Sequence, residues 1–520
     1  MNTERVEAAR EPAGSVSSST PPPAPEARIP ESLVVFGTPV HNVTTQEVLD
    51  WVVRRIRAGE PSYIVTSNLD FMMKAWQDPE FHRIHLEADL VLPDGMPMVW
   101  FSRLFGPALK ERVPGSDLVP RLAELARDHG ASLYTVGAGP GVAQSALGIL
   151  QERYRGLRVA GCDVPPMAPL LQMDHPKMLH SVQEARPDIV LVAFGAPKQE
   201  KWIRLNLYDW KVPVAIGVGG SLDFIAGVQS RAPRWLQVIG LEWFWRLMRH
   251  PRRLMNRYSS NLIFLFMMMV RLFIIRLGPL GRGRGGASLE TSTVEACGAV
   301  SRVLREMESE GESAQWLKEE EPRIDGRAIV LDVSGFTWLN SLELGALVRL
   351  AQACRNAGAL LFLSGVSRRI ARLIRLFRLD RHLEIPDSEA SFRRQLQRSR
   401  SELIHGSAQY HYQGSRLTIV LPREFDGYIV HEARQNLSRA LAEGAPDEIV
   451  VNARQLDYLD CSGGWFVQEL CKDAPLRGIR KLFLVGFSPE TLAAMQKDGF
   501  APGMAEVRDD LPAPPGPIAA

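Results

Sequence analysis

The sequence has few cysteines and almost no net charge. Its five cysteines, at positions 162, 297, 354, 461 and 471, include no C-x-x-C pair. This argues against a disulfide framework or a zinc ribbon and fits a reducing compartment. The 61 Lys and Arg residues against 59 Asp and Glu residues give a net charge of +2. We therefore expect no nucleic-acid partner, and any basic surface must be local.

Length and composition indicate a multidomain globular protein. At about 150 residues per domain, two to four domains are expected, and 45% hydrophobic with 23% charged residues is ordinary for folded domains. The Ser-, Thr-, Pro- and Ala-rich residues 1–32 predict a disordered leader, and the glycine-rich segment at 278–289 predicts a linker. We expect structured parts at residues 33–240, 241–277, 290–397 and 407–507.

Residues 33–240 alternate between strand-like and helix-like segments. A helix at 44–58 is indicated by the capping box formed by Thr44 and Glu47 and by the stop at Gly59. The alternation predicts an α/β fold, a Rossmann-like and mostly parallel sheet with helices on both faces. Ligands of such sheets bind beyond the carboxyl ends of the strands. The apolar, β-branched runs that predict the strands are at 62–67, 133–136, 159–161, 189–194 and 212–218.

Short polar side chains follow the strand-like segments. Thr66 and Asn68 end one, and Asn68 could equally serve as a helix cap. Asp94 follows another, where it could be a general base for a docked hydroxyl; its local pattern alone favours an N-cap residue. Arg112 could hold a phosphate bidentately.

Glycine-rich loops follow three further strand-like segments. The turn containing Gly137 and Gly139 opens a predicted helix and could expose backbone N–H groups to a diphosphate. Asp163 stands where a ribose-binding acid of a dinucleotide site would, although the G-x-G-x-G spacing departs from that fingerprint. The other two loops contain Gln199 and Gly219. Together the loops predict a sugar-nucleotide or dinucleotide pocket.

Residues 33–280 contain no Asp-x-Asp, the usual acidic pair for a metal-bridged diphosphate. We therefore predict no metal site and no cofactor. An enzyme without a metal would need arginines and helix N-termini to stabilise a leaving diphosphate.

Residues 241–277 predict a segment that associates with a membrane. Between Glu242 and Arg284 there are nine arginines and one glutamate, a net +8. Within this segment the apolar run at 262–270 is too short to span a bilayer comfortably, since about 20 residues are needed. Arginines flanking a short apolar run favour a segment at the surface of an anionic leaflet. A buried core helix and a re-entrant anchor are the alternatives.

Two C-terminal segments resemble each other at an offset of about 120 residues, which indicates an internal duplication. In each, a strand-like run (328–334 and 448–453) leads to a short polar loop, a helix and a second strand-like run. The first repeat lacks an obvious opening hairpin, because residues 294–321 predict a polar helix.

The motifs of residues 33–258 together resemble the WecG/TagA/CpsF family of bacterial glycosyltransferases (family 26). In order they are Thr66-x-Asn68, Pro93-Asp94-Gly95, Arg112-Val-Pro-Gly-Ser-Asp117, Gly195-Ala-Pro-Lys-Gln-Glu200, Gly217-Val-Gly-Gly, Gly227-x3-Arg-Ala-Pro233, Glu242-Trp-x2-Arg246 and Pro251-Arg-Arg253-x3-Arg257-Tyr258.

The resemblance implies an inverting transfer of an N-acetylmannosamine-type sugar from a UDP donor to a polyprenyl-diphosphate-linked acceptor, at the cytoplasmic face of the plasma membrane. By this resemblance Asp94 is the base for the acceptor hydroxyl, with Thr66 and Asn68 as polar active-site residues. It makes Arg112 and Gln199 substrate contacts. Arginines of the C-terminal appendage reach the active site in the family; they correspond to Arg246, Arg253 and Arg257.

The two repeats resemble STAS domains, in which an Asp-Ser pair starts a helix and a partner kinase phosphorylates the Ser. The pair is broken in both repeats, as Asn340-Ser341 and as Asp460-Cys461. Phosphorylation of Ser341 is one hypothesis, and a protein-docking module without a switch is favoured over it. For Cys461 a small buried thiol is favoured over a redox-active one.

Two other functions remain open from the sequence. One is a regulatory scaffold that senses a nucleotide without turnover, and the other is an NAD-dependent oxidoreductase using the turn at Gly137 and Asp163. Joint retention of Asp94, Asn68, Arg112 and Gln199 favours the glycosyltransferase.

Overall fold

The computed structural model describes residues 30–238, 240–249, 251–277, 286–304, 315, 324, 327–404 and 406–511. The side chains at 105, 238, 253 and 398–404 are outside the description. So are residues 1–29 of the predicted leader and residues 278–285 of the predicted linker.

A six-stranded parallel sheet forms the centre of the N-terminal domain (residues 30–238), in the order β4-β3-β8-β7-β5-β6. Because β3 is followed by its outer neighbour β4, and β5 by its outer neighbour β6, the order of the strands reverses within the sheet, and ligands of such sheets bind at the carboxyl ends of the strands near this reversal. The strands are β3 (Tyr63–Ser67), β4 (Leu90–Pro93), β5 (Ser132–Gly137), β6 (Arg158–Asp163), β7 (Ile189–Ala193) and β8 (Val214–Gly217).

Helices cover both faces of this sheet, which confirms the predicted fold class. One face packs on α1 (Thr45–Ala58), α5 (Gly115–His129), α6 (Val142–Arg153) and α9 (Ser221–Ile225). The other packs on α2 (Leu69–Gln77), α3 (Pro79–Glu87), α7 (His175–Ala185) and α8 (Lys198–Trp210). The Thr44/Glu47 capping box at the start of α1 is formed as predicted. A hairpin of β1 (Ser32–Val35) and β2 (Thr38–His41), the helix α4 (Met96–Phe105) and the 3-10 turn η1 (Leu170–Gln172) complete the domain.

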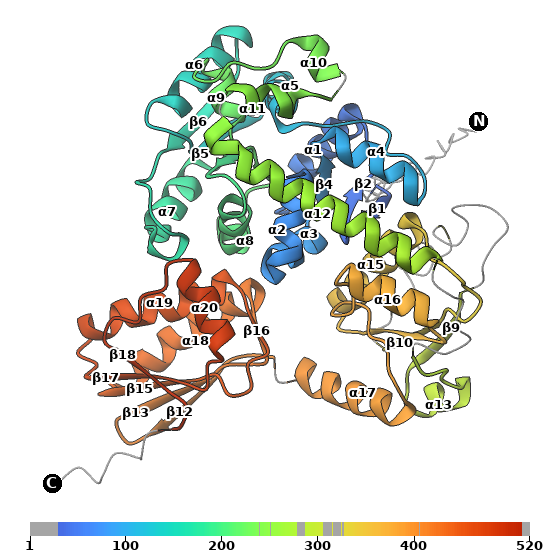
Figure 1. The fold of residues 1–520 in the computed structure, drawn as a ribbon. Helices are drawn as coiled ribbons and strands as arrows, with labels where there is room; N and C mark the ends of the chain where they lie inside the picture. Colours follow the sequence, from blue (N-terminus) through green and yellow to red (C-terminus); the bar gives the residue numbers. More distant parts are fainter. Residues whose placement is uncertain are drawn as a thin grey trace, which may run out of the picture.

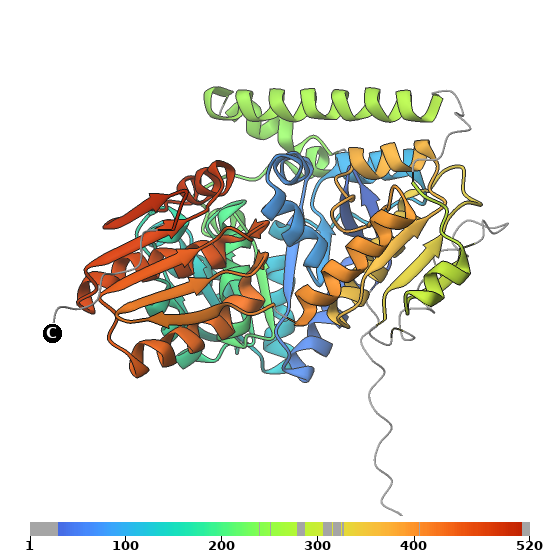
Figure 2. The same cartoon turned by 90° about the horizontal axis from the view of Figure 1, so that it is seen from below.

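The appendage (residues 241–277) contains α11 (Glu242–Arg249) and α12 (Pro251–Leu277), and follows the short α10 (Arg234–Val238). Helix α12 lies flat across the body, diagonally in Figure 1 and along one edge in Figure 2. The prediction that this segment is too short to span a membrane was wrong, because the helix extends beyond both ends of the apolar run. It includes the polar residues before Leu262, and it continues through Arg271 to Leu277. Residues Leu254–Leu277 are long and apolar enough to cross a membrane by length and composition.

Helix α12 is not a buried core helix either. Its inner face, with Phe264, Met268 and Leu272, is buried against the body. Its outer face is apolar and unpacked, with each of the following side chains between 61% and 69% exposed: Leu262, Ile263, Phe266, Phe273, Ile274 and Leu277.

C-terminal domain 1 (residues 286–404) contains a three-stranded parallel sheet in the order β11-β10-β9. The predicted polar helix at 294–321 was wrong where the structure describes it, since α13 ends at Ala296 and Val300–Val303 forms the edge strand β9. The remaining elements are α13 (Thr291–Ala296), β10 (Ile329–Asp332), α15 (Ser341–Asn356), β11 (Leu361–Ser364), α16 (Arg368–Leu376) and α17 (Glu389–Ile404).

C-terminal domain 2 (residues 406–511) has a five-stranded sheet in the order β12-β13-β15-β17-β18, with β12 antiparallel to β13 and the other pairs parallel. Helices α15 and α19 begin at Ser341 and Cys461, 461 − 341 = 120 residues apart, so the duplication is confirmed. The elements are β12 (Gln409–Gln413), β13 (Arg416–Val420), β14 (Glu424–Phe425), α18 (Gly427–Glu443), β15 (Glu448–Asn452), β16 (Tyr458–Leu459), α19 (Cys461–Leu476), β17 (Lys481–Val485), α20 (Pro489–Lys497) and β18 (Ala505–Arg508).

The two C-terminal domains flank the N-terminal domain on different sides (Figure 1). Domain 1 packs α15 against β1, so closely that a Cβ on Gly345 would meet the backbone oxygen of Ser32. Domain 2 packs α18 and α19 against α8. A buried lysine of α8 ties it there, since the Lys201 Nζ atom lies 2.8 Å from Asp498 of domain 2 and also pairs with Glu80 of α3 at 2.6 Å.

Candidate active site

Three of the predicted polar residues meet at the carboxyl ends of β3 and β4. The Asp94 backbone N–H donates to the Ser67 carbonyl at 2.8 Å, which holds the two strand ends together. The Thr66 hydroxyl is buried and donates to the Gly217 carbonyl at 3.0 Å. Asn68 caps α2 through its Oδ1 atom, as the local alternative predicted. Its amide also hydrogen-bonds to the Asp94 side chain.

Asp94 does not serve as a helix cap, and its carboxyl group has the properties of a general base. The N-terminal cap of α4 is Gly95, and no side chain caps this helix, so the N-cap alternative for Asp94 was wrong. The pKa of Asp94 is raised to about 7, chiefly by burial and to a lesser extent by the negative charge of Glu242. Arg246, Arg112 and the hydrogen bond from Asn68 act in the opposite direction. Near neutral pH this carboxyl group can therefore both take up and release a proton.

Glu242, at the start of α11, gathers arginines from three segments beside Asp94. The closest is Arg246, whose Nη2 atom lies 2.7 Å from the Glu242 carboxylate. Arg112 and Arg231 lie at 3.6 Å and 4.0 Å. Arg231 also pairs with Asp117. The appendage thus closes over the strand ends and brings a dense positive charge next to a single candidate base.

A second ion pair connects α12 to the site. Arg257 lies 2.7 Å from Asp70, a buried residue in the first turn of α2, and Lys74 pairs with the same carboxylate at 3.0 Å. Asp70 is only two residues from Asn68, so α12 is fastened to the helix whose cap contacts Asp94. Arg253 belongs to α12, but its side chain is outside the described part of the chain.

Gln199 connects the loops that follow β7 and β8. Its Oε1 atom accepts hydrogen bonds from the backbone N–H groups of Gly195 and Gly219, both at 3.0 Å. Its Nε2 atom donates to Glu200 at 2.6 Å. Gln199 is buried with both ends of its amide occupied, so in this arrangement it shapes the loops. Burial raises the pKa of Glu200 to about 7.

The glycine turn lies at the same sheet edge but away from Asp94. Gly137 ends β5, which is four strand intervals from β4, or roughly 19 Å at the usual spacing. A Cβ on Gly137 would collide with the Phe194 ring, which explains the glycine. Gly139 lies in the following turn, just before α6. The Asp163 carboxylate accepts a hydrogen bond from the Tyr134 hydroxyl at 3.0 Å.

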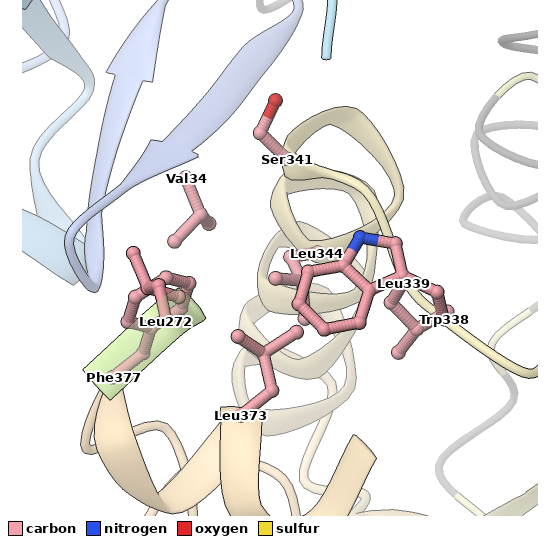
Figure 3. A pocket seen from close by; sticks show the side chains of 8 residues that line it. All are labelled: Val34, Leu272, Trp338, Leu339, Ser341, Leu344, Leu373 and Phe377. Atoms are coloured by element: carbon pink, nitrogen blue, oxygen red, sulfur yellow. The ribbon is translucent and has the colours of Figure 1, made fainter. Parts of the chain in front are cut away.

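Ser341 does not belong to this group of residues and is buried in the contact between domain 1 and the N-terminal domain. It lines a small cavity with Val34, Leu272 and Phe377 (Figure 3). A Cβ on Gly106 would come within 2.5 Å of the Ser341 Oγ atom, and this oxygen has no hydrogen-bond partner among the described residues. A kinase can reach Ser341 only if domain 1 leaves the body.

Cys461 occupies the equivalent position in domain 2 and is also buried against the N-terminal domain. Its backbone N–H donates to Glu80 at 2.6 Å, and its Sγ atom donates to the Lys201 carbonyl at 3.4 Å. Burial raises the pKa of Cys461 well above its ordinary value. The interpretation as a small buried thiol is confirmed.

Sequence reasoning assigned no role to Glu242, Arg231 or Asp70. Glu242 and Arg231 belong to two of the family motifs, so the sequence marked both residues. A motif does not show, however, which charged side chains lie next to each other in the folded protein. Within the described residues, no three His, Cys, Asp or Glu side chains are grouped so that they could hold a metal ion.

Comparison with known proteins follows the same division of the chain. Residues 33–276 match the model of the glycosyl transferase WecG/TagA/CpsF family, and residues 300–392 and 408–512 match the STAS domain. An N-acetylglucosaminyldiphosphoundecaprenol N-acetyl-beta-D-mannosaminyltransferase of Bacillus spizizenii is 31% identical over 192 residues, which are 37% of this chain and 73% of that protein.

Proteins with the same name from two other bacteria are also similar. The one from Bacillus subtilis is 30% identical over 190 residues, covering 36% of this chain and 72% of its own length. One from Staphylococcus aureus (strain MW2) is 27% identical over 204 residues, covering 39% and 78%.

Proposed function

Because the chain belongs to the WecG/TagA/CpsF glycosyltransferase family and carries two STAS domains, we propose that it transfers an N-acetylmannosamine-type sugar from a UDP donor to a polyprenyl-diphosphate-linked acceptor. The polymer would be an exopolysaccharide or a cell-wall polymer. The observation that carries the proposal is Asp94, a carboxyl group that caps no helix and has a pKa of about 7 beside Arg246 and Arg112. Both alternatives, a scaffold without turnover and an NAD-dependent oxidoreductase, lack a use for this arrangement.

The proposed reaction inverts the anomeric carbon in one displacement. The acceptor hydroxyl oxygen forms a bond to the anomeric carbon as the bond to UDP breaks, and UDP leaves with the electron pair. Asp94 takes the hydroxyl proton, which requires that it be ionised beforehand. Asn68 stabilises the ionised form of Asp94 through its hydrogen bond.

Arginines take the place of a metal ion in this proposal. The leaving diphosphate gains negative charge in the transition state, and fixed cations aimed at that charge lower the barrier. Arg112, Arg231 and Arg246 surround Glu242 and can exchange that contact for the diphosphate. Arg257 would hold α12 over the site, and Arg253 remains a predicted contact.

The spacing across the sheet suggests how the donor lies. The diphosphate must be next to the transferred sugar, and therefore on the Asp94 side. The turn at Gly137 and Gly139, roughly 19 Å away, then faces the uridine end of the donor. Gln199 would shape the loops between these ends.

We place the enzyme on the inner face of the plasma membrane, with the outer face of α12 in the lipid surface. An apolar face on a helix that lies flat against the protein fits an in-plane helix better than a spanning one. The STAS domains would serve as docking modules for the N-terminal domain and for protein partners, with Ser341 phosphorylation as a prediction that requires undocking.

The experiment is to incubate the full chain with a panel of UDP-sugars and a short prenyl-diphosphate-linked N-acetylglucosamine acceptor, with and without EDTA. We expect product with UDP-N-acetylmannosamine and no inhibition by EDTA. Inhibition that Mg²⁺ reverses would contradict the metal-free mechanism. Stabilisation of the protein by NAD but not by UDP in a thermal-shift titration would favour the oxidoreductase.

A further inference from the structure

Helix α16 of C-terminal domain 1 has one strongly basic face. Arg368, Arg372 and Arg375 are all exposed, and their spacing of four and three residues places them in one stripe. The opposite face, with Ile370, Leu373 and Ile374, is buried in the protein. Within the described part of the chain, none of the three stripe arginines forms an ion pair or a hydrogen bond. The stripe is therefore a concentrated positive charge that no described side chain neutralises.

Helix α16 packs directly beside α12. The Arg369 Nε atom donates to the Ile275 carbonyl at 3.0 Å, and its guanidinium also bonds to the Arg276 carbonyl at the last turn of α12. Leu373 of α16 and Leu272 of α12 line the same cavity (Figure 3). These contacts hold the end of α12 against domain 1.

The two helices lie on the same side of the molecule, with α12 outermost (Figure 2). The outer face of α12 offers apolar side chains such as Phe266, Phe273 and Leu277, and the stripe beside it offers only positive charge. The arrangement matches the layers of a bilayer. The apolar face of α12 would lie among the acyl chains, and the arginine stripe would lie at the level of the phosphates.

We propose that the stripe, formed by Arg368, Arg372 and Arg375, is a binding surface for anionic phospholipid headgroups, so that C-terminal domain 1 is a second membrane-contacting element of the enzyme. The inference rests on the in-plane placement of α12 in the proposed function. Guanidinium groups bind phosphates through directed hydrogen bonds, and each basic residue at a negative surface adds to membrane affinity.

The test uses the full chain and its R368Q/R372Q/R375Q variant in vesicle sedimentation. The vesicles are phosphatidylcholine alone or phosphatidylcholine mixed with phosphatidylglycerol. We expect the triple variant to bind the anionic vesicles roughly a hundredfold more weakly, from the usual contribution of three basic residues. Its binding to phosphatidylcholine should be unchanged, and added salt should reduce the difference.

The matched control removes three exposed arginines from C-terminal domain 2, as R439Q/R477Q/R480Q. It changes the net charge equally, so a loss of similar size in both triple variants would overturn the proposal. Unchanged anionic binding of the stripe variant would also overturn it and would leave an acidic protein as the partner for this face.

A second variant separates this proposal from the placement of α12. F266S/F273S should weaken binding to both kinds of vesicle, because it removes apolar contacts. If this variant binds like the parent while the stripe variant loses anionic binding, the α12 placement fails and the stripe stands as an independent site. If the parent binds neither vesicle, both proposals fail.

Discussion

Asp94 and Asp460 show how one local pattern serves two purposes. Each carboxylate comes directly after a short strand and just before a helix, and burial raises the pKa of each to about 7. Asp460 is the N-cap of α19 and accepts from the backbone N–H groups of Ser462, Gly463 and Gly427. Asp94 caps no helix and is under the charge of Arg246 from the appendage and of Arg112 from the N-terminal domain.

The difference teaches that a raised pKa alone does not identify a catalytic group. The oxygens of Asp460 fasten a helix, whereas Asp94 accepts from the Asn68 amide and caps no helix. Substitutions at the two positions should therefore separate activity from stability.

The largest expected effect is at Asp94. Replacing it in D94N should lower turnover by on the order of 10²–10⁴, because the base is lost while the shape remains. UDP binding, measured by calorimetry, should stay near that of the parent. D460N is the control, and its turnover should stay within about threefold. Equal losses in both variants would remove the distinction.

The dependence of kcat/KM on pH should follow the ionisation of Asp94. Asp94 must be ionised to accept a proton, so activity is lost as the pH falls through its pKa of about 7. From pH 7 to pH 5 the ionised fraction of Asp94 falls from about one half to about one hundredth, so kcat/KM should fall roughly fiftyfold. D460N should keep this acid limb, and D94N should not show it. An unchanged acid limb in D94N would assign the titration to another group.

Disturbing the buried amide of Gln199 should lower activity less than the loss of Asp94. E200A removes the acceptor for the Gln199 Nε2 atom and should let the loops at Gly195 and Gly219 shift, lowering kcat/KM by about tenfold to a hundredfold. E200Q keeps an acceptor oxygen and should recover most of the activity. If E200A and E200Q behave alike, Glu200 acts through its charge and not by orienting Gln199.

The smallest effect is on stability at Asp460. D460A removes the cap of α19 and should reduce the free energy of unfolding by about 1–2 kcal/mol. D460N keeps a capping oxygen and should lose less. Urea unfolding of the full chain, monitored by tryptophan fluorescence, would measure the stability of both variants. An equal decrease in the free energy of unfolding of D94A would contradict the view that Asp94 does not stabilise the fold.

The sequence predicted those parts of the site that local signals encode. The helix caps at Thr44 and Asn68 depend only on residues close in the sequence, and so does the pattern that marks each strand of the central sheet. The length of α12 was underestimated because Arg271 interrupts the apolar run, although its guanidinium lies over the Trp76 ring in the folded protein. Strand β9 was missed because it is a short edge strand whose partner, β10, starts 29 residues later (329 − 300).

The docking of the C-terminal domains could not be predicted from one sequence. Lys201 and Arg204 look like solvated residues of an amphipathic helix, yet both are buried. The Asp498 partner of Lys201 lies almost 300 residues further along the chain (498 − 201 = 297). Such pairings follow from the tertiary arrangement, and no local pattern records them.

Chemical rescue of D94A measures whether the Asp94 carboxylate acts as the base. Removal of the carboxylate leaves space beside Asn68 and Arg246 that formate can occupy as a replacement base. If Asp94 is the base, transfer by D94A should rise with formate concentration and saturate, while D460A and E200A should not respond. A D94A variant that binds UDP like the parent but gains no activity from formate would contradict the assignment of Asp94 as the base.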